Sequence, residues 1–402
     1  MKRITILMVI LCTCLASVAW AQGPHRYTVT DLGTLGGTYS QPSTAGLSNS
    51  GWVGGDAYLT GDTAYHAFLW KKRTGMIDLG TLGGPNSGTG YQVSDSAGAV
   101  GSAETSVPDP QGYDCLGMGT YLTCLPFRWQ NGVMTALPTL GGHDGFGLGI
   151  NNLGVAVGWS ETSTPDPDCG GYRQSAVIWI KGQVYELPLF PGDWNGAARV
   201  INDNGQVAGW SGGCARLHAL LWQNGTPIDL GSFGGTIDIA PFDINNQGQI
   251  VGYSYYPDNY TVHGFLWQKS TGMLDLGTLP GDVFSWGIGI NSKGQTVGGS
   301  EDASYNERAY LWQNGVMTDL NTLIPPASPF YLLEADGIND AGQIAGYIWV
   351  YSTGEVHAFL ATPTTAYGAN SESPKVVLPD NVRTLLQQRR GGRFGVGPKG
   401  RQ

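Results

Sequence analysis

The sequence predicts an all-β fold, a seven-bladed β-propeller of four-stranded antiparallel blades that is closed by the N-terminal strand. The 402 residues include 63 glycines, and only 13% of the residues are charged. This composition excludes long solvated helices, while a hydrophobic content of 41% with 13 tryptophans excludes a disordered chain. Three short motifs also recur in a constant order, which is the signature of a repeat architecture.

Residues 1–21 are predicted to be a secretory signal peptide. Met1-Lys2-Arg3 is basic, residues 4–15 are apolar, and Ala19-Trp20-Ala21 supplies the small residues of a cleavage site. The apolar run is too short to span a bilayer. We therefore expect cleavage after Ala21 and a secreted protein, extracellular or periplasmic, with no transmembrane segment in its mature form. The alternative is a short membrane anchor that is never cleaved.

The first motif, Ile-Asn-x-x-Gly-Gln-x-x-Gly, joins the first two strands of each repeat. Its asparagine and first glycine are typical of a tight turn, in which glycine supplies a positive φ. Ala97 stands at the glycine position of one copy, where a left-handed backbone would cost about 1–2 kcal/mol. The copies are residues 47–55, 93–101, 150–158, 201–209, 244–252, 290–298 and 338–346.

Two further motifs predict the third and fourth strands of each repeat. His66-Ala67-Phe68-Leu69-Trp70 is the clearest third strand, and Asp31-Leu32-Gly33 ends a fourth strand and begins the crossing to the next repeat. The turn positions are 43 to 57 residues apart. Four short strands at such a period are typical of a propeller blade, with the small residues of the first strand lining the axis. An open array of small β-sandwiches is the alternative.

The two ends of the repeat region are complementary. The region begins with a strand of the fourth type, residues 27–32, and ends with a strand of the third type, residues 357–360. The N-terminal strand can therefore complete the last blade and remove an open edge. We assign residues 22–363 to the propeller and residues 364–402, with 7 basic and 2 acidic residues, to a disordered basic tail.

Together, the three motifs resemble the HAF repeat family of probable extracellular repeat proteins, named after its His-Ala-Phe motif. The likeness extends over residues 27–361. It implies export and a repeated β unit, and it supplies no catalytic residues. Three copies replace the motif histidine with Leu125, Ser175 and Arg308, which argues against a shared catalytic role. We expect the remaining four, His66, His218, His263 and His357, to bond to a neighbouring blade.

Four cysteines follow the signal peptide, an even number that indicates disulfides in an exported chain. Cys115 and Cys124 share one long loop, while Cys169 and Cys214 lie in matching loops of adjacent repeats. These positions predict the pairs Cys115–Cys124 and Cys169–Cys214. The absence of a Cys-x-x-Cys pair argues against a zinc site.

The crossings between blades end near the channel mouth and differ most from repeat to repeat. Carboxylates and aromatic rings gather there, a combination that suits sugar binding, and variable loops on a fixed scaffold often carry binding sites. Solvated turn residues, with the tryptophans wedged between blades, are the alternative interpretation. The candidate residues are Tyr39, His143, Asp144, Asp193, Trp194, Asp238, Asp282 and Trp286.

Other sequence patterns give weaker or negative indications. Between residues 22 and 363 there are 12 basic and 29 acidic residues, so nucleic acid is not an expected partner. Gly209-Trp210-Ser211-Gly212-Gly213 matches a nucleophile elbow, but Ser211 occupies a repeated strand position rather than a strand-to-helix turn. Asp166 and Asp168 are a fragment of a calcium loop that lacks its third acid and distal glutamate. Ca²⁺ is therefore the one cofactor that these residues suggest.

From these observations we expect a monomeric, secreted propeller that acts as a binding module or scaffold for a glycan or an extracellular protein, without catalysis. The alternative is a secreted glycoside hydrolase or lyase that uses carboxylates such as Asp193 and Asp282. In a third hypothesis, the acidic face holds a structural cation.

Overall fold

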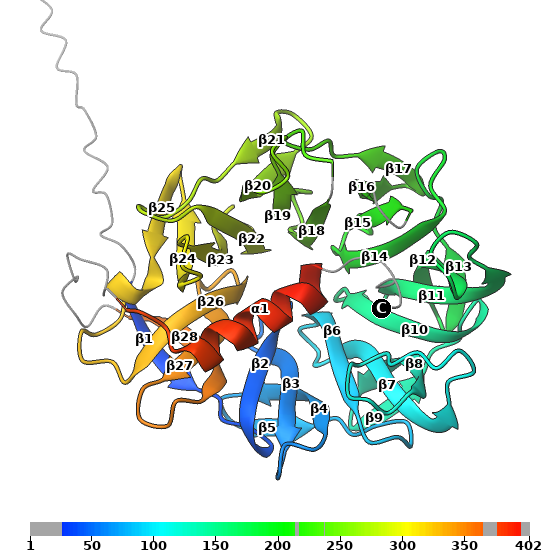
Figure 1. The fold of residues 1–402 in the computed structure, drawn as a ribbon, viewed down its shortest axis with the longest axis horizontal. Coiled ribbons are helices and arrows are strands. Elements are labelled where there is room, and N and C mark those ends of the chain that lie inside the picture. Colours follow the sequence, from blue (N-terminus) through cyan, green and yellow to red (C-terminus); the bar gives the residue numbers. More distant parts are fainter. Residues whose placement is uncertain (1–25, 214–216, 237, 365–375, 395–402) are drawn as a thin grey trace, which may run out of the picture.

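A computed structural model of the chain describes residues 26–213, 217–236, 238–364 and 376–394. This part is all-β except for a 3-10 turn, η1 (Leu320–Thr322), and one helix, α1 (Asp380–Phe394). Small antiparallel sheets are arranged around a common centre, as in a propeller (Figure 1). The predicted signal peptide, residues 1–21, lies outside the described residues. Within them, no helix is long and apolar enough to cross a membrane.

Six sets of four consecutive strands each form an antiparallel sheet. The first contains β2 (Gly36–Leu47), β3 (Val53–Leu59), β4 (Tyr65–Lys71) and β5 (Gly75–Asp78). The second contains β6 (Ser87–Val93), β7 (Ala99–Pro108), β8 (Leu122–Gln130) and β9 (Val133–Ala136). The third contains β10 (Gly141–Ile150), β11 (Ala156–Pro165), β12 (Tyr172–Ile180) and β13 (Gln183–Glu186).

The next three sets follow the same order. The fourth contains β14 (Asn195–Ile201), β15 (Val207–Gly212), β16 (Leu217–Gln223) and β17 (Thr226–Asp229). The fifth contains β18 (Ile239–Ile244), β19 (Ile250–Tyr255), β20 (Val262–Gln268) and β21 (Gly272–Asp275). The sixth contains β22 (Phe284–Ile290), β23 (Thr296–Glu301), β24 (Glu307–Gln313) and β25 (Val316–Asp319).

The last set combines the two ends of the repeat region. It contains β26 (Phe330–Ile338), β27 (Ile344–Val350) and β28 (Val356–Thr364), and β28 pairs antiparallel with β1 (Arg26–Asp31). A single parallel bridge between Tyr39 and Val356 joins this set to β2, so the eight strands form one mixed sheet. The N-terminal strand therefore lies beside a strand of the third type, as its sequence predicts.

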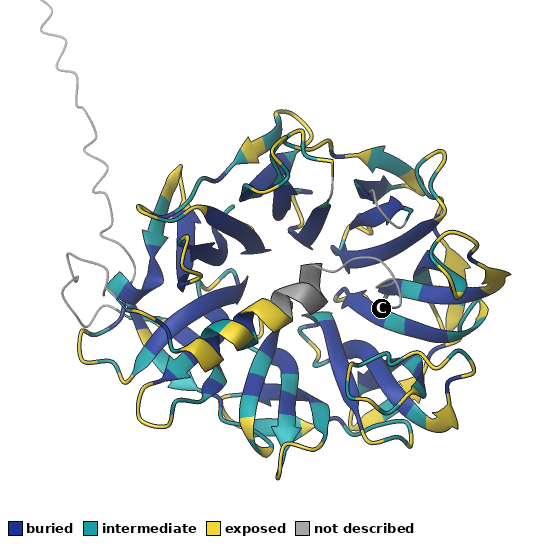
Figure 2. Ribbon diagram, viewed as in Figure 1, coloured by how far each residue is buried: buried dark blue, intermediate teal, exposed yellow. Residues whose placement is uncertain are grey.

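Burial follows the position of a strand within its sheet. Every residue of the inner strands β14, β18 and β22 is buried, whereas the outer strands β13 and β17 are largely exposed (Figure 2). Two of the third-strand tryptophans hold neighbouring segments with their indole N–H groups. Trp179 donates to the Pro138 carbonyl at 2.8 Å, and Trp222 donates to the Pro188 carbonyl at 2.6 Å. Each of these side chains thus fastens a sheet to the crossing that precedes it.

The turns between the first two strands have the expected backbone. Gly205 has a φ of +75°, and Ala97 adopts a φ of 61° at the equivalent position, which is the strained exception that the sequence predicts. Five of the seven turns begin with an asparagine that closes the turn with its own side chain, and the other two begin with Ser48 and Ser94. Asn202 Oδ1 accepts the N–H groups of Asn204 and Gln206, at 3.1 and 3.0 Å.

The prediction of a disordered tail over residues 364–402 is wrong for residues 376–394. Val382 and Leu386 are four residues apart on one face of α1, Leu378 just before the helix extends this apolar stripe, and all three are buried. A count of charges over the whole tail concealed this local pattern. Helix α1 crosses the centre of the ring of sheets (Figure 1).

The N-terminal strand can be tested as an integral part of the last sheet. Tyr27 is 1% exposed, packs in the core of that sheet, and donates its N–H to the Leu323 carbonyl. Tyr27→Ala is expected to lower the free energy of unfolding by about 3–5 kcal/mol, as for other buried aromatic residues. Thr28→Ala, on the exposed side of the same strand, is expected to change it by less than about 0.5 kcal/mol. Urea unfolding of both variants measures this difference, and equal effects would contradict the assigned role of β1.

Candidate functional site

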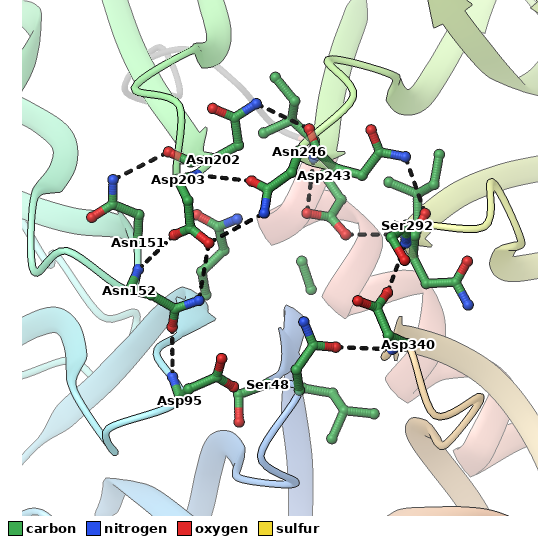
Figure 3. Close-up of a pocket in the computed structure, with 18 of the residues that line it drawn as sticks. Ser48, Asp95, Asn151, Asn152, Asn202, Asp203, Asp243, Asn246, Ser292 and Asp340 are labelled. Atoms are coloured by element: carbon green, nitrogen blue, oxygen red, sulfur yellow. Dashed lines mark hydrogen bonds between the residues drawn. The ribbon is translucent and has the colours of Figure 1, made fainter.

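The turns between first and second strands surround a cavity at the centre of the sheets. Its volume is about 130 Å³, and all seven turns contribute to its wall (Figure 3). The residues around its mouth are almost all polar. They include Ser48, Asn49, Asp95, Asn151, Asn152, Asn202, Asp203, Asn245, Asn246, Asn291, Ser292 and Asp340.

Hydrogen bonds run from turn to turn around this mouth. The N–H of Asp95 donates to Asn152 Oδ1 at 2.8 Å, and the N–H of Asn152 donates to Asp203 Oδ1 at 2.9 Å. The same pattern links the last turn to the first, where the N–H of Asp340 donates to Asn49 Oδ1 at 2.9 Å. Since each side chain accepts a neighbour's N–H, the polar groups at the mouth hold one another in place (Figure 3).

A second ladder uses the preceding residue, an asparagine, of the third to the seventh turn. Asn202 Nδ2 donates to the Asn245 carbonyl at 3.0 Å, and Asn339 Nδ2 donates to the Ser48 carbonyl at 3.2 Å. These bonds are buried, so the amide side chains connect adjacent sheets without competition from solvent.

Two polar side chains from the inner strands reach into the channel beneath the mouth. Gln92 Oε1 accepts the N–H of Ile201, which lies on a non-adjacent sheet, at 2.9 Å. Asp243 accepts the N–H groups of Ile244 and Ile290, at 2.8 and 3.0 Å. Burial raises the pKa of Asp243 to about 7. Most other repeats have glycine at the corresponding position, so these two side chains make the channel asymmetric.

Helix α1 crosses the channel on the side opposite the turns. The helix lies in front of the ring in Figure 1 and behind the ring of turns in Figure 3. The stripe formed by Leu378, Val382 and Leu386 packs against Tyr331, Leu333, Tyr347 and Val356 of the last sheet. The N–H of Leu378 also donates to Asn306 Oδ1 at 2.9 Å, which ties the segment to the loop before β24. The two ends of the channel therefore differ.

The repeated histidines pair mainly with an aspartate of their own sheet, although His66 Nε2 also lies 3.1 Å from the Pro85 carbonyl in the crossing to the next sheet. His66 Nδ1 lies 2.8 Å from Asp78 Oδ1, and this hydrogen bond raises the pKa of His66 above its ordinary value. His263 pairs with Asp275 in the same way, across a third and a fourth strand. The register of the two strands, which spacing alone does not reveal, places these partners side by side.

His218 departs from this pattern. Its Nδ1 lies 2.8 Å from Asp193 Oδ2 in the preceding crossing, and Ser211 donates its hydroxyl to the same carboxylate oxygen. Ser211 therefore bonds to the acid and not to the imidazole, which is not the connectivity of a Ser-His-Asp triad. Its Oγ also accepts the N–H of Phe190, as Ser160 and Ser254 do for their own crossings. Ser211 therefore holds the crossing before β14 in place, as the serines at the equivalent position of other repeats do for their crossings.

The predicted mouth residues fall into separate local groups. Trp286 is 4% exposed and belongs to the core, whereas Trp194 is exposed beneath the guanidinium of Arg173. Asp282 forms an ion pair with Arg308 at 2.6 Å, and the Tyr39 hydroxyl donates to Gln41 at 2.7 Å. With Asp193 held by Ser211 and His218, and Asp282 by Arg308, each carboxylate of the proposed glycosidase pair has internal partners.

The carboxyl group of Asp144, which was predicted to be a ligand-binding group at the mouth, has a structural role. Asp144 is fully buried, and its Oδ1 accepts the N–H of Cys124 at 2.7 Å. Burial, together with the adjacent Glu161 and Asp109, raises the pKa of Asp144 to about 8. His143 beside it stacks near Tyr172, with ring centroids 5.8 Å apart. Asp144 thus anchors the loop that holds the disulfide, and only the fold brings Asp109 and Glu161 to it.

One predicted disulfide is confirmed and one includes an undescribed residue. Cys115 and Cys124 are bonded, with their Cα atoms 6.2 Å apart. Cys214, the predicted partner of Cys169, lies outside the described residues.

The candidate calcium loop is a hydrogen-bonded turn. Asp166 Oδ1 accepts the N–H groups of Asp168 and Cys169, both at 3.0 Å, and Asp166 Oδ2 accepts from Asn195 Nδ2 at 2.6 Å. These bonds outweigh burial and hold the pKa of Asp166 below its ordinary value. In the described ranges, no group of three or more His, Cys, Asp or Glu side chains is arranged to hold a metal ion.

Another carboxylate lies between two sheets. Asp238 accepts the hydroxyl of Tyr253, and burial raises the pKa of Asp238 to about 6. It lines a second, smaller cavity of about 110 Å³ together with His218 and Asp229.

No family model and no curated protein matches the chain. Several solved structures do. A structure from an analysis of two prolyl endopeptidases matches with a TM-score of 0.50 and 7% identity, over 86% of this chain and 51% of that one. A Pyrococcus horikoshii acylaminoacyl peptidase matches with a TM-score of 0.48 and 10% identity, over 85% and 54%. The β-propeller domain of the Trilobed protease from Pyrococcus furiosus, described as an open velcro topology, has a TM-score of 0.44 and 10% identity, over 68% and 79%.

This chain spans about half the length of the first two peptidases that it matches. The first likeness supports the fold. The proteins in that structure are prolyl endopeptidases. This finding overturns the expectation of a non-catalytic binding or scaffold propeller for a glycan or protein, with its glycosidase alternative. The repeat motifs specify turns and strand packing, and these are the same whether a propeller acts alone or beside an enzyme.

The raised pKa of Asp144 predicts a pH dependence of stability. Because the folded pKa, about 8, exceeds the unfolded value of 3.8, the folded state holds a proton that the unfolded state loses, so stability falls as the pH rises from about 4 to 8. Asp144→Asn mimics the protonated acid and should flatten this slope, with a gain of at least about 1 kcal/mol at pH 8. The exposed Asp168→Asn is the control. Urea unfolding at pH 5 and pH 8 measures both, and a parallel loss of stability in Asp144→Asn would contradict the assignment.

The docking of α1 gives a further prediction. Val382→Asp places a charge in the apolar contact with the last sheet and should release the helix. Amide hydrogen exchange over residues 380–388 is then expected to accelerate by at least about tenfold, while exchange in β14 and β18 stays unchanged. Gln387→Asp, on the exposed side of the helix, should preserve the wild-type protection. Unchanged exchange in Val382→Asp would show that this stripe does not hold the helix.

Proposed function

We propose that this chain is the propeller part of a peptidase. In this proposal the central channel selects the peptides that reach a hydrolytic site supplied by a partner or by a further polypeptide segment. The main support is the likeness to the prolyl endopeptidase structure, which extends over 86% of this chain and about half of that one. The bonding of Ser211 to Asp193 instead of His218 is the reason for placing the hydrolytic site elsewhere.

The proposal includes a closed ring of seven blades. Three contacts between the ends of the repeat region support it. Strand β1 pairs with β28, Asn339 donates to the Ser48 carbonyl, and His357 Nδ1 lies 2.9 Å from Asp31 Oδ2. The last contact repeats the histidine–aspartate pairs of the intact repeats, so β1 takes the place of a fourth strand. We also retain the HAF repeat assignment and an exported location, with which the Cys115–Cys124 disulfide agrees.

The size and chemistry of the channel are the basis for peptide selection. The cavity, with a volume of about 130 Å³, is far smaller than a folded domain, so only an extended segment can enter it. Its wall presents amide and carboxylate groups, which can pair with the N–H and C=O groups of an extended chain. With α1 over the opposite end, entry is assigned to the mouth formed by the turns.

Peptide entry is tested by fluorescence anisotropy with labelled, unstructured peptides of about ten residues. Ser292→Trp narrows the mouth and should weaken binding at least about tenfold, because Ser292 lines the cavity. Lys293→Trp, exposed on the same turn and absent from the cavity wall, is the matched control. Circular dichroism establishes that both variants are folded. No saturable binding, or equal binding by Ser292→Trp, would refute selection by the channel.

The peptidase assignment needs its own experiment. The tagged full-length protein is crosslinked in its native cells, recovered, and assayed with internally quenched peptides. Hydrolysis is expected above that of an untagged control, and it should fall when the chain carries Ser292→Trp. Recovered material without peptidase activity would overturn this part of the proposal.

A further inference from the structure

Arg199 is an unusual residue in the channel because it is charged and almost fully buried. It lies on the inner strand β14 and is 2% exposed. The corresponding position of β6 holds Tyr91, and that of β18 holds Phe242. The next residues on those strands, Gln92 and Asp243, line the cavity described above. The layer that contains Arg199 is therefore the one adjacent to the cavity.

Two aromatic rings hold the guanidinium group in the channel. Arg199 Cζ lies 5.7 Å from the centroid of the Tyr91 ring and 5.3 Å from that of Phe242. The two rings meet edge to face, with centroids 6.5 Å apart. Since the three residues come from three different sheets, the arginine side chain points across the channel, where cation–π contacts fix its orientation.

The hydrogen-bonding capacity of the Arg199 guanidinium is not fully used within the described residues. Its Nη1 atom is buried and has no hydrogen-bond partner. Asp238 feels its charge, but Asp238 Oδ2 accepts the Tyr253 hydroxyl and Asp238 Oδ1 is itself unpartnered. A buried cation without an acceptor is unfavourable, and the aromatic faces supply no lone pair. This arrangement calls for an acceptor from outside the chain.

We propose that Arg199 binds a carboxylate that enters the channel and, building on the proposed function, that this group is the C-terminal carboxylate of a peptide. The planar fork of a guanidinium matches a carboxylate with two parallel hydrogen bonds. The acidic body of the protein, with 29 acidic and 12 basic residues between positions 22 and 363, disfavours multiply charged anions such as phosphate. A chain terminus can reach through a narrow mouth that a folded surface cannot.

The inference is tested by comparing paired peptides in calorimetric titrations at one pH and salt concentration. Each peptide is made with a free C-terminal carboxylate and as the C-terminal amide, and a third version carries the amide with an internal glutamate. The acid is expected to bind at least about tenfold more tightly than either amide. Arg199→Met retains the packing between the rings and should abolish this preference. Arg173→Met removes a guanidinium that also lies over a ring, at the exposed Trp194, and should retain it.

Thermal unfolding separates a binding role from a structural one. A structural arginine would make Arg199→Met less stable, whereas an unsatisfied charge predicts an unchanged or higher Tm for this variant. Millimolar acetate should raise the Tm of the wild type and of Arg173→Met but not that of Arg199→Met.

The outcomes distinguish this inference from the proposed function. If acid and amide peptides bind equally, peptide entry stands and the role of Arg199 is refuted, as expected for a water bridging Arg199 and Asp238. If no peptide binds but acetate protects the wild type through Arg199, the carboxylate site stands and its assignment to peptides fails. If neither peptide nor acetate binds, both proposals fail.

Discussion

The asparagine that begins five of the seven tight turns carries the interaction on which the ring of turns depends. Asn202 Oδ1 closes its own turn, while Asn202 Nδ2 donates to the carbonyl of the next turn at 3.0 Å. One side chain thus fixes both the local hairpin and the distance to the neighbouring sheet. Because these bonds are buried, a neighbour without such an acceptor would leave a donor unsatisfied. The same bond therefore links successive turns from Asn151 to Asn339 and continues to the carbonyl of Ser48.

Against this regular background, the departures from symmetry are confined to a few positions. Most repeats place glycine where Gln92 and Asp243 enter the channel, and no other repeat has a cation at the position of Arg199. Likewise, His218 turns to Asp193 although Asp229 occupies the position that pairs with histidine elsewhere. A regular scaffold does not require these residues, and such local violations are expected where function or strain resides. Gln92, Asp243 and Arg199 lie on inner strands, which is the reason for placing the candidate function in the channel.

The order of the strands could be predicted from the sequence, because the same turn motif recurs in each repeat. The end strand at residues 27–32, the left-handed Ala97 and the Cys115–Cys124 bond all follow from local pattern and spacing. The site could not be anticipated in the same way. Arg199 is visible in the sequence as one charge in a strand of small residues, but its unpartnered state depends on three sheets meeting at one point. The crossings were predicted to carry the binding site because they vary from repeat to repeat. Most of their carboxylates instead accept hydrogen bonds or form ion pairs within the chain.

The helix α1 shows a second limit of sequence patterns, and it completes the description of the channel. A stripe of three apolar residues within a basic tail has no obvious partner until β26, β27 and β28 present the surface of Tyr331, Leu333 and Tyr347. Once docked, the helix leaves the two ends of the channel chemically different. One end is a ring of exposed amide and carboxylate groups, and the other lies under a helix held by apolar contacts. A channel with one polar mouth and one covered end gives an entering chain a direction, and the buried guanidinium lies between the two.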